Sequence, residues 1–145
     1  MAISSAICNS FKQEILVGTH NLTASSGDTF KIALYTSSAS LGAGTTAYST
    51  SNEITNTSGS AYTAGGATLT SVTPVLDSST AVCDFADVSF TSASFTANGC
   101  LIYNDSQSDK AVAVIAFGGD KTVSSGTFTI QFPTADASNA IIRIA

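Results

Sequence analysis

The sequence contains no tryptophan and few charged residues. Lysine, arginine, aspartate and glutamate make up 10% of its 145 residues, against roughly 25% in an average soluble domain. Serine and threonine are abundant instead. Another protein can cover such a surface without removing many charges from water, so the composition favours a subunit of an assembly. Hydrophobic residues amount to 43%, which indicates a folded domain rather than a disordered chain.

The few basic residues form no cluster. Five lysines and arginines are scattered along a chain whose formal net charge is −5. Nucleic acids and anionic membranes bind to concentrated basic surfaces, so we expect neither partner. No apolar run is long enough to span a bilayer, and the N-terminus lacks the basic start and unbroken apolar stretch of a secretory signal. These absences predict a protein that stays in the cytoplasm where it is made.

Cysteine is scarce, and its spacing is uninformative. The three cysteines are an odd number and no two of them have the spacing of metal ligands. Cys83 and Cys100 alternate in phase with neighbouring apolar residues, which predicts that both are small core side chains. A disulfide between them is an alternative that a reducing compartment disfavours.

The N-terminal segment has the pattern of a helix. Ile3, Ile7, Phe11 and Ile15 recur every fourth residue, and Gly18 follows at the position of a helix C-cap glycine. This pattern predicts a helix over about 5–17, the only helix that we expect.

The rest of the chain has the patterns of β-strands. The run 110–117 is apolar on both faces, as in a central covered strand, and Gly118–Asp120 should turn the chain after it. Pro74 indicates an edge strand or a strand end, and Asn98-Gly99 a tight turn or a bulge. Strands are predicted at 29–36, 67–76, 80–85, 87–91, 94–97, 100–104, 110–117, 127–132 and 140–145. Short strands separated by turn residues predict one mainly β domain over 1–145, an antiparallel β-sandwich or jelly-roll-like barrel with one N-terminal α-helix.

One long segment, 37–66, does not fit this rhythm. It is rich in serine, threonine, glycine and alanine, with Leu41, Tyr48, Ile54 and Tyr62 as isolated apolar side chains. A loop of this length without structure is unusual in a small domain. The segment either contains an irregular strand or is an arm ordered by a neighbouring subunit, and we favour the arm.

No group of residues predicts an active site. The single histidine, His20, follows the helix, and we interpret it as a helix-end or interface residue rather than a catalytic base. Asp105 and Asp109 offer oxygen ligands for Ca²⁺, but the glycine and glutamate of a calcium loop are missing. Asp84 and Asp87 form a carboxylate pair, yet the sequence has no tryptophan on which a sugar could stack. We therefore predict a protein that is not an enzyme and that uses no metal or cofactor.

Short motifs follow one another along nearly the whole chain. In order they are Phe11-Lys12, Gly18–Asn21, Phe30–Ser38, Thr45–Tyr48, Asn52-Glu53, Tyr62–Gly66, Phe85–Val88, Leu101–Asn104, Phe117–Asp120 and Phe132-Pro133. With these motifs in this order, the chain resembles small β-rich structural proteins of tailed bacteriophages of aquatic bacteria. None of the motifs is catalytic.

The resemblance implies a structural protein of the virion, made in the cytoplasm of the host bacterium. Within that group it implies a capsid decoration, or cement, protein that forms homotrimers and contacts the major capsid protein or other virion proteins. The alternatives are a tail, collar or fibre-adaptor subunit, and a surface module for receptor binding or adhesion. The residues predicted to contact the partner are apolar side chains of the helix and the arm: Ile7, Phe11, Leu41, Tyr48, Ile54 and Tyr62.

Overall fold

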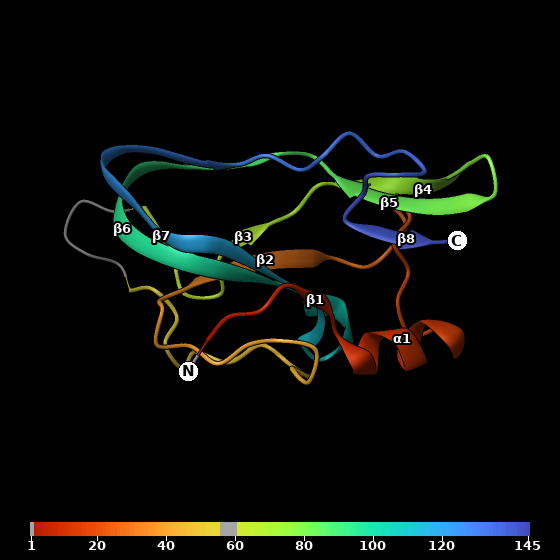
Figure 1. The fold of residues 1–145 in the computed structure, drawn as a ribbon, viewed down its shortest axis with the longest axis horizontal. Helices are drawn as coiled ribbons and strands as arrows, with labels where there is room; N and C mark the ends of the chain where they lie inside the picture. The colour runs from red at the N-terminus through yellow and green to blue at the C-terminus, as the bar shows by residue number, and fades with distance from the viewer. Residues whose placement is uncertain (1, 56–60) are drawn as a thin grey trace.

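Two antiparallel sheets pack against each other, with one helix near the N-terminus (Figure 1). The computed structural model describes residues 2–55 and 61–145. The larger sheet has the order β1 (Ala6–Ile7), β7 (Lys110–Ile130), β6 (Val88–Asn104), β2 (Phe30–Tyr35) and β3 (Ala67–Thr68). The smaller sheet has the order β4 (Ser71–Asp77), β5 (Thr80–Phe85) and β8 (Ile142–Ile144). The predicted mainly β sandwich with an N-terminal helix is confirmed.

The long β6–β7 hairpin bends back over itself, so that its outer half joins the layer of the smaller sheet (Figure 1). The bend lies where Ala97 pairs with Lys121 and Gly99 pairs with Ala116. Residues 117–120 of β7 therefore oppose Asn98 alone, and such a bulge bends a strand. The side chain of Asn98 closes the bulge with a 2.9 Å hydrogen bond to the Asp120 carboxylate.

This hairpin corrects several sequence predictions. The strands predicted at 87–91, 94–97 and 100–104 are one strand, β6, and those at 110–117 and 127–132 both belong to β7. Asn98-Gly99 lies at a bulge, one of its two predicted alternatives, and makes no tight turn, because the pairing with β7 shifts register between Ala97 and Gly99. It lies inside β6, where a Cβ on Gly99 would come within 2.7 Å of the Ile3 side chain and 2.8 Å of the Ile115 carbonyl oxygen. This glycine is needed for close packing, not for a turn.

Aromatic rings fill the space between the layers. All eight phenylalanines belong to ring pairs, and the Phe30–Phe85 pair, with centroids 5.7 Å apart, joins β2 to β5. The predicted central strand is confirmed, since residues 111–114 are buried between β1 and β6. Pro74 lies in β4, at the edge of its sheet, as predicted.

The three cysteines are free and buried. Burial raises the pKa of Cys8 to about 11 and the pKa values of Cys83 and Cys100 to about 12. Thiols with such pKa values are protonated at neutral pH and behave as small core side chains, because the thiolate is the reactive form.

The helix α1 is shorter than predicted and spans Asn9–Leu16. Its predicted first turn is extended instead, because Ala6 and Ile7 pair with β7 as β1, and the Ser5 hydroxyl accepts a hydrogen bond from the Ala116 amide. The helix ends at Gly18, as expected, with a φ of 77°. In the described part of the chain, no helix has the length and apolar character required to cross a membrane.

The segment 37–66 lies against its own chain over its described residues, 37–55 and 61–66. Isolated bridges join Leu41 to Ile3, Ala47 to Lys110 and Glu53 to Tyr35. The Ile54 amide also donates to the Leu34 carbonyl. These contacts attach the described residues of the segment to the rest of the chain, and an arm ordered by a neighbouring subunit stays a prediction.

Candidate functional site

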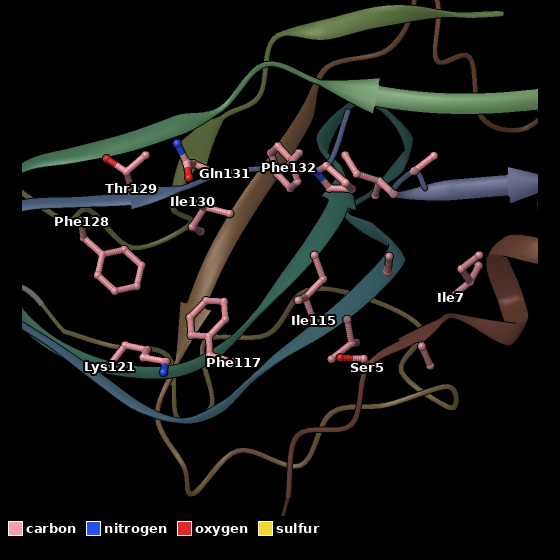
Figure 2. A pocket seen from close by; sticks show the side chains of 16 residues that line it. Ser5, Ile7, Ile115, Phe117, Lys121, Phe128, Thr129, Ile130, Gln131 and Phe132 are labelled. Atoms are coloured by element: carbon pink, nitrogen blue, oxygen red, sulfur yellow. The ribbon is translucent and has the colours of Figure 1, made fainter. Parts of the chain in front are cut away.

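An apolar groove runs along the open side of the sandwich. Its volume is about 740 Å³, within the range of roughly 300–1,000 Å³ common for binding sites. Both walls come mainly from β7, because the bent hairpin places the two halves of this strand in different layers (Figure 2). Phe117 on one wall faces Phe128 on the other, with ring centroids 6.0 Å apart.

The side chains that line the groove are only partly buried. Ile115 and Phe117 project from one half of β7, and Phe128 and Ile130 project from the other half. Phe132 lies two residues beyond the end of the strand. They pack against the core but remain half-exposed. Partly exposed apolar side chains gathered in one groove are typical of a surface that binds another molecule.

The groove borders an unpaired strand edge. Residues 121–130 of β7 pair with β6 on one side, and the sheet has no further strand beside them, since β1 pairs only with residues 113 and 114. Where this pairing is regular, at 121–123 and 128–130, every second residue points its backbone amide and carbonyl away from the sheet, while register shifts on either side of Gly126 interrupt the alternation. Such an edge can pair with another extended chain.

Among the described residues that line the groove, Lys121 is the only charged one. It lies at one end, beside Phe117 and Phe128 (Figure 2). Its ammonium group forms no ion pair within residues 2–55 and 61–145. An anionic group at this end of the groove would therefore meet an unpaired positive charge.

The predicted partner-contact residues do not lie together in this groove. Ile7 lines it, while Leu41 lies in a second cavity formed by small side chains of the segment 37–66. Tyr48 is half-buried and stacks on Tyr103. Phe11, Ile54 and Tyr62 are buried in the core, with exposed fractions of 2%, 4% and 0%. The last three present no surface to a partner, so their predicted role has no basis in this structure.

The sequence did not identify the other groove residues, because their role depends on whether a neighbouring strand covers them. The alternation of Phe128, Ile130 and Phe132 with polar residues predicts a strand with one apolar face. It cannot tell whether a neighbouring strand covers that face. Only the folded arrangement of the two halves of β7 leaves the face partly open.

The single histidine belongs to a hydrogen-bonded network, away from both cavities. The Asn104 side chain donates to His20 Nδ1 over 2.9 Å and to the Asp28 carboxylate over 2.8 Å, and its oxygen accepts from the Ser106 amide. These partners fix the orientation of the Asn104 amide. His20 Nδ1 is then an acceptor, so Nε2 carries the hydrogen and donates to Glu14 over 3.0 Å. This network joins α1 to the end of β6 and leaves neither ring nitrogen free for a substrate.

Asp28 makes this network sensitive to acid. Burial by itself would raise the pKa of Asp28, but hydrogen bonds from Asn104, Asn21 and Gln107 hold it below its ordinary value of 3.8. A depressed pKa means that the folded state binds the proton less readily than the unfolded chain does. The stabilisation is therefore present at neutral pH and is lost as the pH falls from about 4 through the folded-state pKa.

We expect Asp28→Asn to flatten this acid dependence. The effect at neutral pH should be below about 1 kcal/mol, because the carboxylate is only partly buried and solvent screens it. The measurement is the free energy of unfolding in urea between pH 3 and pH 7. If the variant and the wild type lose stability with the same slope below pH 4, Asp28 does not carry the effect.

A second buried carboxylate, Glu53, is also fully occupied. It accepts hydrogen bonds from the Tyr48 hydroxyl (2.7 Å), the Tyr62 hydroxyl (2.6 Å) and the Gly65 amide (2.8 Å). The Tyr62 hydroxyl in turn accepts from the Leu34 amide of β2. Burial, followed by the hydrogen bond to Glu53, raises the pKa of Tyr62 far above its usual value. This cluster anchors the segment 37–66 on the larger sheet.

Among the residues that the structure describes, no three histidine, cysteine, aspartate or glutamate side chains are grouped as metal ligands. Compared with protein-family models, with curated proteins and with solved structures, the chain matches none of them.

Proposed function

We propose that this protein is a structural component of a bacteriophage particle, and that it acts as a capsid decoration or cement protein by binding other virion proteins. The observation that carries the binding role is the apolar groove beside the unpaired edge of β7. The phage context comes from the resemblance of the sequence motifs to small structural proteins of tailed phages.

The described residues favour binding over catalysis. General acid–base chemistry needs a titratable group within reach of a bound substrate. The groove contains one lysine and no histidine, cysteine or carboxylate. His20 and Glu53, the buried groups that have the right chemistry, are both held in the hydrogen-bonded networks that stabilise the fold.

A cement protein that binds only the assembled shell stabilises it by mass action. A trimer would present three copies of the groove, and simultaneous contacts multiply weak affinities. The low charge of the chain suits this role, because few charges lose their hydration when the surface is covered.

The copy number of the protein in purified particles tests this function. We expect hundreds of copies, measured by quantitative mass spectrometry against the major capsid protein. A count near a dozen would instead identify a tail, collar or fibre-adaptor subunit. Absence from the particle would refute a virion role altogether, and binding of the isolated protein to host cells would favour the adhesion alternative.

Phe128→Ser should weaken binding to shells that lack the protein by at least about tenfold, since a buried aromatic side chain is a common energetic centre of an interface. Thr127→Ser is the matched control, because Thr127 is exposed, neighbours Phe128 and is not among the residues that line the groove. Cosedimentation with shells measures both variants. Equal binding by the two, each with wild-type thermal unfolding, would exclude the groove as the contact.

A further inference from the structure

We propose that the groove is filled by an extended segment of a different protein, which adds as a strand to residues 121–130 of β7 and carries a carboxylate at the Lys121 end. This inference rests on the proposed binding function and identifies the chemistry of the partner. Three features of the groove lead to it: the free backbone edge, the alternation of side chains along that edge, and the unpaired lysine.

The free edge calls for a peptide. Outward amides and carbonyls along 121–130 have no strand beside them in the larger sheet. An extended peptide satisfies these groups and gains affinity from main-chain hydrogen bonds. A lipid chain of the same volume would fill the apolar groove but leave the backbone edge without partners.

The alternation along β7 defines the side chains of that peptide. Exposure alternates strictly over 127–132, with Phe128, Ile130 and Phe132 half-buried toward the groove, and Thr127, Thr129 and Gln131 exposed. A strand added beside this edge shares its pleat, so its own side chains also alternate between the groove and solvent. We therefore expect apolar residues at every second position of the bound segment.

The charge at the end of the groove defines where an acidic residue of the segment lies. Lys121 is the only charged lining residue and has no ion-pair partner in the described chain. Nearby Asp120 is held by Asn98 at the bulge. An aspartate or glutamate in the bound segment, placed beside Lys121, would complete this pair and fix the register of the added strand.

A second copy of this chain fits the groove less well. The candidate in another copy is the edge strand β4, with exposed Val72, Val75 and Leu76. Pro74 removes one amide donor from that strand. A strand already paired on one side also cannot insert side chains between two layers as a free segment can.

A selection from random peptides of about nine residues, the length of an ordinary strand, tests the inference on the full-length protein. We expect the selected peptides to carry valine, isoleucine, leucine or phenylalanine at every second position, and aspartate or glutamate near one end. A parallel selection on Lys121→Glu should keep the apolar alternation and replace the acid by lysine or arginine.

Three further measurements apply to the best selected peptide. Its binding should slow hydrogen exchange of backbone amides within 121–130, and Phe128→Ser should weaken its affinity at least about tenfold while Thr127→Ser leaves it unchanged. Dodecanoate, a carboxylate with an apolar chain, should not compete with it.

Several results would overturn this inference. They are a selection without apolar alternation, a charge preference that Lys121→Glu does not reverse, displacement of the peptide by dodecanoate, and a groove-dependent dimer in sedimentation. None of them depends on the copy number in particles. A failed selection together with hundreds of copies per particle would therefore reject the peptide occupant and keep the proposed function. A successful selection together with absence from the particle would keep the occupant and reject the proposed function.

Discussion

Gly66→Ala should destabilise the fold by roughly 3–5 kcal/mol, combining overpacking against fixed atoms with a strained backbone. Gly66 follows the Glu53 cluster and has a φ of 81°. A Cβ at this position would lie 1.8 Å from the Ile32 carbonyl oxygen and 2.6 Å from the Ile32 carbonyl carbon. Both are backbone atoms of β2, which pairs with β6 and β3 and cannot move aside without breaking those pairs.

Gly118→Ala is the matched control for this substitution. Gly118 has nearly the same φ, 78°, but a Cβ there would meet no atom within 4 Å. The control therefore suffers the left-handed strain alone, which costs roughly 1–2 kcal/mol. Urea unfolding of both variants gives the comparison. Equal losses would mean that β2 yields to the added methyl group and that the close approach does not limit this position.

The sequence could predict the glycine but not its reason. Gly65-Gly66 indicates a turn or a bulge, because such pairs commonly interrupt strands. The contact with Ile32 joins segments more than thirty residues apart and depends on the folded arrangement. The same holds for Gly99. The pair Asn98-Gly99 indicates a tight turn or a bulge by local pattern, and tertiary packing selects the bulge inside β6.

Local patterns predicted best where burial follows a simple period. The strand at 80–85 has the predicted bounds, and the central strand was recognised because it is apolar on both faces. The helix start was wrong because residues 6 and 7 satisfy the helical pattern equally well as a short strand, and pairing with β7 decides between the two. The groove lay beyond prediction for a related reason, since its walls are two halves of one strand brought together by a four-residue bulge.

Glu53→Ala should lower the free energy of unfolding by about 3 kcal/mol, because it removes three hydrogen bonds from a buried carboxylate and leaves the Gly65 amide without its acceptor. The segment 37–66 should detach locally before the whole domain unfolds. Glu53 holds Tyr48 and Tyr62, which lie at either side of it in the segment 37–66, so the segment should detach from β2 and become open to proteases.

Limited proteolysis and urea unfolding separate this effect from a general loss of charge. Glu53→Gln keeps an oxygen that accepts from Tyr62 and Gly65, so it should recover most of the stability and resist cleavage within the segment. Asp105→Ala, which removes an exposed carboxylate at the β6–β7 turn, should leave both measurements near the wild-type values. If Glu53→Ala unfolds cooperatively without early cleavage in 37–66, the segment is held by its apolar side chains. Its polar cluster then satisfies buried groups without anchoring the loop.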